Sequence, residues 1–177
     1  MPRKGQITRS VRIDKDVDEH LRQLAEEQRV SVNLLANKAL RRFTEWDAYG
    51  EKFGFLSIPS GLFAKLMDYL TNEQAKELGE WVGRDLVKEY VMFWFKDMST
   101  ETVLEAFPRL FARYSRSFDY EERNEGPNHV AILKHNRGMK WSFYYGSVVE
   151  AMFRELVHQP VRVERSDNQI VARFRTV

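Results

Sequence analysis

A short alternating segment near the front of the chain limits most strongly what this sequence can fold into. Residues 6–13 read Gln-Ile-Thr-Arg-Ser-Val-Arg-Ile, a pattern of period two that is typical of a β-strand. One face of the strand would carry Ile7, Arg9, Val11 and Ile13, and the other Thr8, Ser10 and Arg12. A lone strand leaves its backbone N–H and C=O groups without partners. We therefore expect two chains to pair strand to strand, as a basic ribbon that fits the DNA major groove.

Two helical patterns follow this segment directly. Asp14 or Asp16 can cap the first helix, whose apolar stripe consists of Val17, Leu21, Leu24 and Ala25. Ser31 is a favourable N-cap for the second helix. The predicted inner side of that helix consists of Val32, Leu35, Ala36, Ala39, Leu40 and Phe43. Two helices of this size bury little apolar surface by themselves, so pairing of two chains would also supply their core.

The rest of the sequence predicts a second, larger domain. Residues 1–47 form the first domain, residues 48–57 a linker with two glycines, and residues 58–177 the second domain. Helices are expected at 60–70, at 71–95, at 99–114 with a kink at Pro108, and at 138–158. Strands are expected at 117–123, 129–135, 161–165 and 170–175. The order αααββαββ defines an α+β domain.

Composition and charge narrow the class of protein. The chain is 43% hydrophobic and 31% charged, as in globular proteins, and no apolar run approaches the roughly 20 residues of a bilayer span. Absence of cysteine excludes disulfides and thiolate metal sites, so we expect a cytoplasmic protein with no membrane partner. Residues 48–177 hold 18 basic and 18 acidic side chains, whereas residues 1–13 hold four basic ones and no acid. Positive charge therefore lies where phosphate would be met.

Two short motifs carry a family resemblance. Ser10-Val11-Arg12-Ile13 and Ser31-Val32-Asn33, in the order strand, helix, helix, resemble the ribbon–helix–helix DNA-binding domains of the Arc, MetJ and CopG-like repressors. The resemblance covers about residues 5–46 and implies base contacts by Thr8, Ser10 and Arg12, with Arg12 suited to guanine. It implies that the start of the second helix, at Ser31, Val32 and Asn33, faces a phosphate. Arg3, Lys4 and Arg9 are expected to add phosphate contacts.

Ordinary explanations exist for the same residues. A basic alternating strand is also typical of a sheet edge that is protected by charge. Lys38, Arg41 and Arg42 on the second helix fit a solvated face. Arg9 departs from the apolar residue that the inner face of such a ribbon normally carries.

The second domain has a resemblance of its own. Trp141-Ser142-Phe143-Tyr144-Tyr145-Gly146, followed by a helix and two strands, is similar in order to vinyl-reductase-type and haem-NO-binding-like small-molecule domains. The resemblance implies a pocket for an apolar or aromatic effector, lined by Trp94, Phe111, Trp141, Tyr144 and Tyr145. The metal-site cysteines of that group are absent here. Aromatic residues at helical spacing also fit an ordinary core, and that interpretation stands beside the pocket.

The sequence offers little support for metal binding or catalysis. His129 and His135 share a predicted strand but lie about 20 Å apart by strand rise, too far to share one metal ion. No catalytic motif is present, so we expect no enzyme activity, no metal and no cofactor. Glu121, Glu122 and Glu125 are expected to form a solvated turn.

Three hypotheses follow from these patterns. The first is a transcriptional regulator that binds double-stranded DNA as a homodimer or tetramer and whose second domain senses an effector or oligomerises. The second is an antitoxin-like or scaffold protein of the ribbon–helix–helix class whose second domain binds a partner protein. The third is an enzyme or ligand carrier that uses its first 47 residues only to dimerise. Loss of DNA binding on Arg12→Ala would separate the first two from the third.

Overall fold

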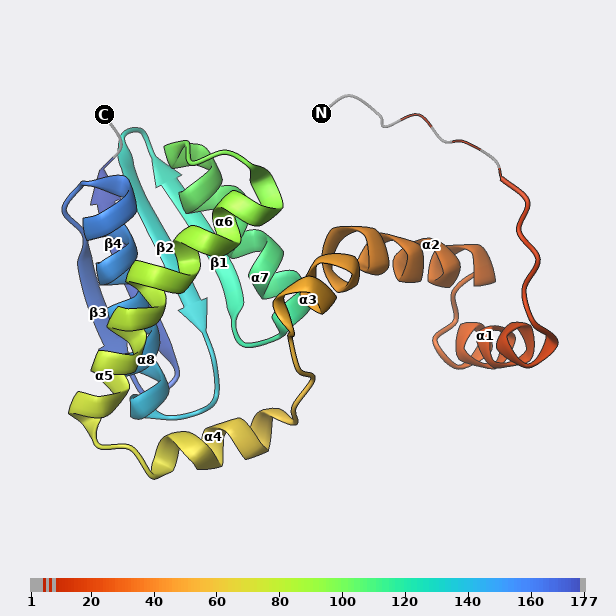
Figure 1. Ribbon diagram of the computed structural model, residues 1–177, viewed down its shortest axis with the longest axis horizontal. Coiled ribbons are helices and arrows are strands. Elements are labelled where there is room, and N and C mark those ends of the chain that lie inside the picture. The colour runs from red at the N-terminus through yellow and green to blue at the C-terminus, as the bar shows by residue number, and fades with distance from the viewer. Residues whose placement is uncertain (1–4, 6, 8, 176–177) are drawn as a thin grey trace. The chain divides into compact units, whose positions relative to one another are not determined.

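The chain folds into two compact units, Met1–Phe55 and Leu56–Val177. The computed structural model describes residues 5, 7 and 9–175 (Figure 1). Helices make up the first unit, and helices with a four-stranded sheet make up the second, so the α+β class is confirmed.

The first unit consists of consecutive helices. Helix α1 spans Lys15–Glu27 and α2 spans Val32–Arg42, and a π-helical turn, η1 at Phe43–Asp47, joins α2 to α3 at Ala48–Phe53. Asp14 occupies the N-cap position of α1 without a side-chain capping bond. Ser31 caps α2 as expected, because its hydroxyl accepts a hydrogen bond from the Leu34 amide at 3.1 Å. Gly54, with φ of +66°, ends α3 in the left-handed region that glycine favours.

Two expectations for this part of the chain differ from the structure. Ile7 and Arg9–Asp14 form no strand, because within the described part of this chain the segment pairs with no other strand. The expected linker at 48–57 is helical over Ala48–Phe53. Ala48, Glu51 and Lys52 have high helix propensity, and the glycine at position 50 is buried within the helix. The two units divide after Phe55.

The helices of the second unit begin at strong local signals. Helix α4 spans Ser60–Asp68. One continuous helical rod follows, made of α5 at Asn72–Trp81, the π-helical turn η2 at Val82–Leu86 and α6 at Val87–Phe95. Thr71 and Gln74 form a reciprocal capping box at its start. The next helix contains the turn η3 at Thr102–Ala106 and α7 at Phe107–Ser115.

Two hairpins form the antiparallel sheet, with strand order β1-β2-β4-β3. Strand β1 (Asp119–Glu125) pairs with β2 (Asn128–Lys134), and β3 (Arg162–Ser166) pairs with β4 (Gln169–Arg175). The first loop is tighter than expected, because Glu125 pairs with Asn128. Gly126, with φ of +61°, takes the first loop position, as glycine does in a type II′ turn.

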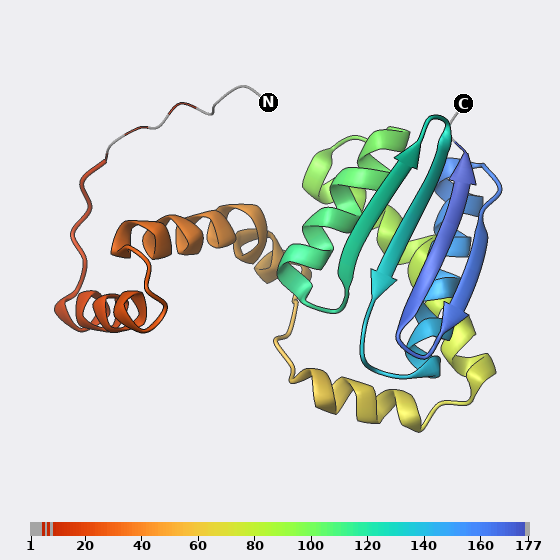
Figure 2. The same ribbon diagram turned by 180° about the vertical axis from the view of Figure 1, so that it is seen from behind.

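Helix α8 (Met139–Met152) connects the hairpins and continues through the π-helical turn η4 (Phe153–Val157). Helices α5, α6 and α8 lie on one face of the sheet (Figure 2). Alternate strand residues point toward these helices and are buried, among them Ala131, Leu133, Ile170, Ala172 and Phe174. They form the core together with Val91, Val103 and Phe153 from the helices.

Candidate nucleic-acid interface and aromatic cluster

The N-terminal segment presents its apolar and its basic side chains to solvent alike. Ile7 and Val11 are 81% and 72% exposed, and Arg9, Ser10 and Arg12 are exposed as well. Thr8, Arg3 and Lys4 lie outside the described residues. The segment therefore has the side chains of a ribbon strand, while one chain by itself gives its apolar face nothing to pack against.

The helices of the first unit also leave several large apolar side chains exposed. Ala25 is the one buried residue of α1, and α2 has none. Leu24 is 44% exposed, Leu34 54% and Leu40 61%. Exposed apolar stripes on two neighbouring helices are costly in water, at about 25 cal/mol per Å² of apolar surface. The first unit is thus incomplete as a hydrophobic core.

The start of α2 has the geometry of an anion-binding helix end. The Ser31 carbonyl accepts from the amides of Leu34 and Leu35, at 3.0 and 3.3 Å. Among the described residues, no hydrogen bond occupies the amides of Val32 and Asn33. The Asn33 side chain is partly engaged, because its Oδ1 accepts from Asn37 Nδ2 at 3.1 Å. Unoccupied amides and the helix dipole favour an anion at this point.

The five residues expected to line an effector pocket fall into two groups of packed rings. Trp141 lies 5.4 Å from Tyr145 and 6.2 Å from Tyr144, and the two tyrosine rings are 4.8 Å apart. Trp94 and Phe111 form the second group, with ring centroids 6.1 Å apart. Tyr90 stacks on Phe111 at 5.8 Å. Ring contacts of this kind are typical of a core and leave the proposed effector pocket as a prediction.

Tyr90 of the second group interacts electrostatically with Tyr144 of the first. Burial, together with the neighbouring Tyr145 and Tyr90, raises the pKa of the Tyr144 phenol above its usual value. Burial also raises the pKa of Tyr145 to about 12. Both phenols are therefore neutral at physiological pH.

A buried hydrogen-bond relay lies beside the aromatic cluster. His135 Nδ1 accepts from the Arg137 amide at 3.3 Å, so Nε2 carries the proton and donates to Ser142 Oγ at 3.0 Å. Ser142 in turn donates to the Ser166 carbonyl. Burial, with the charge of Arg137, lowers the pKa of His135 to about 4. The relay joins the start of α8 to the end of β3 with a neutral histidine.

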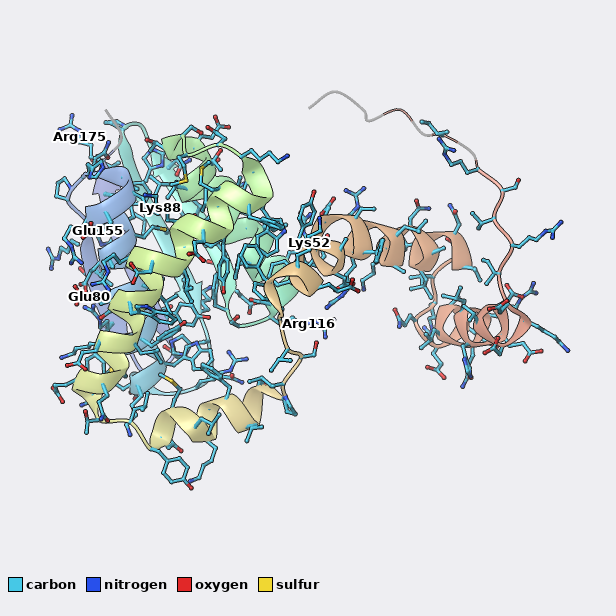
Figure 3. All side chains as sticks on the ribbon, in the orientation of Figure 1. Lys52, Glu80, Lys88, Arg116, Glu155 and Arg175 are labelled. Carbon is cyan, nitrogen blue, oxygen red and sulfur yellow. The ribbon has the colours of Figure 1, made fainter. Side chains whose placement is uncertain are left out.

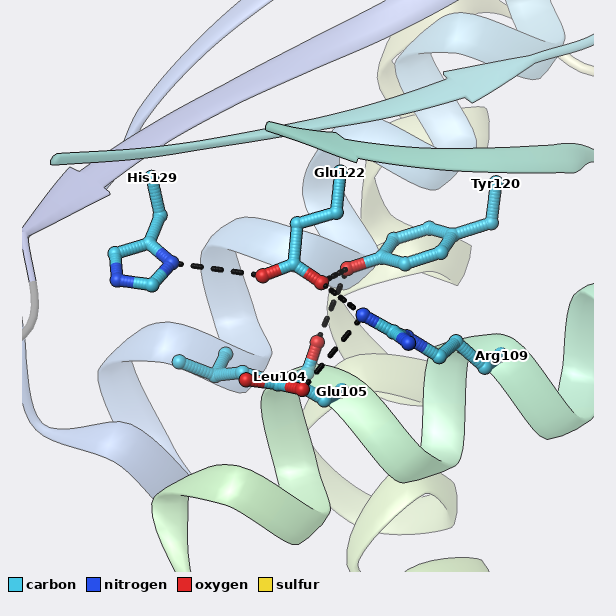
Figure 4. A network of polar contacts seen from close by, with 6 residues as sticks. All are labelled: Leu104, Glu105, Arg109, Tyr120, Glu122 and His129. Carbon is cyan, nitrogen blue, oxygen red and sulfur yellow. Dashed lines mark hydrogen bonds and ion pairs between the residues drawn. The ribbon is translucent and has the colours of Figure 1, made fainter. Parts of the chain in front are cut away.

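A polar network at the other end of the sheet was not expected from the sequence (Figure 4). Glu122, predicted to lie in a solvated turn, faces the helices from β1, and its side chain is only 6% exposed. Its carboxylate accepts from Arg109 Nη2 at 2.8 Å and lies 3.5 Å from His129 Nδ1. Burial raises the pKa of Glu122, but the hydrogen bonds from Arg109 and His129 outweigh it and lower the pKa overall.

Alternation along β1 is the signal that could have located Glu122, since it shares one face with Phe118 and Tyr120. Glu122 pairs with Ala131, and Tyr120 pairs with Leu133, so both β1 residues share the buried face of β2. The expected strand, 117–123, already contained Glu122, but its glutamates were interpreted as a solvated turn because a charged side chain is rarely buried. Glu121 points to the opposite face, where it forms an ion pair with Lys134.

No protein-family model matches the sequence, and no curated protein matches it. Within residues 5, 7 and 9–175, no group of three or more potential ligands is placed to hold a metal ion. None of the helices in this part of the chain has the length and apolar character needed to cross a bilayer.

Proposed function

We propose that this chain is a dimeric, sequence-specific DNA-binding regulator of transcription, whose N-terminal segments pair as a two-stranded ribbon in the major groove. One observation carries the proposal: the N-terminal segment, α1 and α2 all leave large apolar side chains exposed in a single chain. Ile7, Val11 and Leu40 are 81%, 72% and 61% exposed. A second copy of the same surface is the partner that covers all three elements at once.

Charge supports DNA as the ligand of the paired ribbon. Once the apolar face is covered by the partner, Ser10 and Arg12 lie on the opposite face, since side chains alternate along a strand. Arg12 can donate two hydrogen bonds to the O6 and N7 atoms of a guanine. Thr8, outside the described residues, belongs to the same face by the same alternation.

The phosphate backbone would be held by groups on both sides of the ribbon. The unoccupied amides of Val32 and Asn33 suit one phosphate, and Ser31 holds this helix end in place through its bond to Leu34. Arg3, Lys4 and Arg9 add cations that contact phosphate without reading sequence. Binding should therefore weaken as salt rises.

The second unit either controls DNA binding or holds the copies of the chain together. We propose that it senses an effector or oligomerises, and that either event changes how the two DNA-binding units are held. A ligand can do this only if it binds one arrangement more tightly than the other. The aromatic groups around Trp141 and Trp94 are the proposed effector-binding region.

The test begins with selection of a DNA site from a random duplex library by the intact protein. Affinity for that site is then compared between the parent, Arg12→Ala and Lys88→Ala, which removes an exposed cation from α6 (Figure 3). We expect Arg12→Ala to lose about 1–3 kcal/mol, roughly 5- to 150-fold in affinity, with selectivity relaxed at one base pair. Lys88→Ala should bind as the parent does. Equal affinity of all three proteins would overturn the assignment of the ribbon.

A further inference from the structure

A second exposed apolar surface lies on the other unit, along helix α4. Leu62, Leu66 and Tyr69 follow one another at helical spacing and are 52%, 52% and 78% exposed. Leu56 and Ile58, in the segment that leads into the helix, are 84% and 46% exposed. We call these five residues the α4 stripe.

Helix α4 is already fixed to its own unit by a different set of side chains. Phe63, Met67 and Leu70 have the same i, i+4, i+7 spacing and pack against Ala75 and Trp141. The rings of Phe63 and Trp141 meet edge to face at 4.9 Å. The α4 stripe is therefore an additional apolar surface, and a helix that is apolar on so wide an arc is normally covered on both parts of it.

The charges beside the α4 stripe favour a protein surface over a polyanion. Lys65 lies at the edge of the stripe, with its Nζ 5.7 Å from the centre of the Tyr69 ring. Asp68 lies 3.9 Å from the same Nζ. Lys140 Nζ also lies there, 2.7 Å from the Asp68 carbonyl oxygen. Two cations and one anion leave a net charge of +1, whereas an anionic membrane or a nucleic acid is bound by a cluster of several basic residues.

Chain connectivity favours a second copy of this chain as the occupant. The stripe starts at Leu56, the first residue of the second unit. Leu62 is seven residues beyond Phe55, a reach of at most about 25 Å even for extended chain. If the N-terminal units pair, the two α4 helices are tethered at effective concentrations of about the millimolar range, so even a weak contact would form.

We propose that the α4 stripe is a second dimer contact, in which α4 of one copy packs against α4 of the other. This inference rests on the proposed pairing of the N-terminal units. Two contacts in series would fix how far apart the two DNA-binding units are held, and an event in the second unit could then alter DNA affinity through α4.

Absence of native cysteine allows a direct test on the full chain. Three single-cysteine variants are compared under mild oxidation at micromolar protein: Val11→Cys in the ribbon, Leu66→Cys in the α4 stripe, and Lys88→Cys as an exposed control on α6. A disulfide can form only between copies. We expect Val11→Cys and Leu66→Cys to cross-link at least about tenfold faster than Lys88→Cys, as effective concentration dictates. Circular dichroism checks that each variant is folded.

A second variant separates stripe packing from mere proximity. Tyr69→Cys is cross-linked with and without the pair of changes Leu62→Lys and Leu66→Lys, which replace exposed side chains and leave the inner side of α4 intact. We expect the two lysines to slow this cross-link to the rate of Lys88→Cys while Val11→Cys still cross-links in the same background.

The outcomes distinguish the two proposals. Fast cross-linking at Val11→Cys with Leu66→Cys as slow as Lys88→Cys overturns the α4 contact and leaves the ribbon in place. Slow cross-linking at both positions overturns both. A third outcome is that Leu66→Cys does not cross-link and that the parent co-sediments with anionic vesicles by a contact that needs the Leu66 side chain. The α4 stripe is then a membrane-binding surface, and the inference is wrong.

Discussion

The Tyr120 hydroxyl donates a hydrogen bond to the Leu104 carbonyl at 3.1 Å, across the gap between β1 and the helix that carries α7. Leu104 lies four residues before Pro108, which has no N–H to offer the carbonyl at that position. The preceding turn, η3, is π-helical, and there Thr102 accepts from the Phe107 amide. The Tyr120 hydroxyl thus donates to a carbonyl that lacks its usual helical donor because residue 108 is proline.

Tyr120→Phe should lower the free energy of unfolding by about 1–3 kcal/mol, because it leaves the Leu104 carbonyl buried without this donor. Chemical denaturation of the parent and variant measures the change. Tyr69→Phe, at a tyrosine that is 78% exposed, is the control and should have little effect. Burial and the charge of Glu122 raise the pKa of Tyr120 above its usual value, so the phenol remains a donor across the usual pH range.

A change at Pro108 separates the loss of the bond to the Leu104 carbonyl from the simple loss of a hydroxyl. In a Pro108→Ala background the residue at position 108 regains an N–H, and the Leu104 carbonyl has a helical donor. Tyr120→Phe should then cost less than it does in the parent. A double-mutant cycle with no coupling between positions 108 and 120 would contradict this account.

Helices α5 and α8 should tolerate no side chain at Gly79. A Cβ at this position would lie 2.2 Å from the Tyr144 backbone carbonyl oxygen, and backbone cannot move aside cheaply. Gly79→Ala is therefore expected to destabilise the protein by about 1–3 kcal/mol or more through overpacking. Thermal unfolding measures the effect.

Gly61→Ala supplies the matched control for Gly79→Ala. No atom lies within 4 Å of a Cβ at Gly61, and this residue is exposed in helix α4. Alanine favours helix over glycine, so the change should leave stability unaltered or raise it by up to about 1 kcal/mol. Equal losses at both positions would show that the close approach of α5 and α8 is not the cause.

Stability should fall as pH drops below about 6.5, because His135 is buried in its neutral form. Its pKa is about 4 in the folded chain and 6.5 when unfolded. Between these values the unfolded chain binds the extra proton, so stability is complete above pH 6.5 and declines to pH 4 by up to about 3 kcal/mol. Denaturation curves of the parent and His135→Gln across this range isolate the effect; a parallel decline in both would assign it elsewhere.

Local signals in the sequence predicted most helix starts. Ser31 and the Thr71–Gln74 capping box mark the starts of α2 and α5, because these side chains satisfy amides within their own turn. Alternation and helical spacing gave the order of elements in the second unit. The order of strands in the sheet was not predicted, since it depends on which hairpins meet across the fold.

Burial of polar residues was harder to predict than secondary structure. Glu122 was predicted to be solvated although it lies within the expected strand 117–123, because the sequence does not show which charged side chain of a strand finds a buried partner. The Arg109 that balances its charge lies 13 residues earlier in the sequence, on α7. Likewise the contact between His135 and Ser142 depends on how α8 begins, at Gly138 with φ of +81°.

Leu40, on the side of α2 that is expected to face a partner, allows a sedimentation test that distinguishes a monomer from a dimer. Leu40 is 61% exposed, so in a monomer Leu40→Lys should be neutral or improve solubility. If a second copy covers Leu40, the same change places a charge in an apolar contact and should shift the sedimentation profile at micromolar concentration from dimer toward monomer. Lys38→Glu, on the exposed side of the same helix, should leave the profile unchanged. A parent that sediments as a folded monomer would remove the basis of the ribbon, because one N-terminal segment has no strand to pair with.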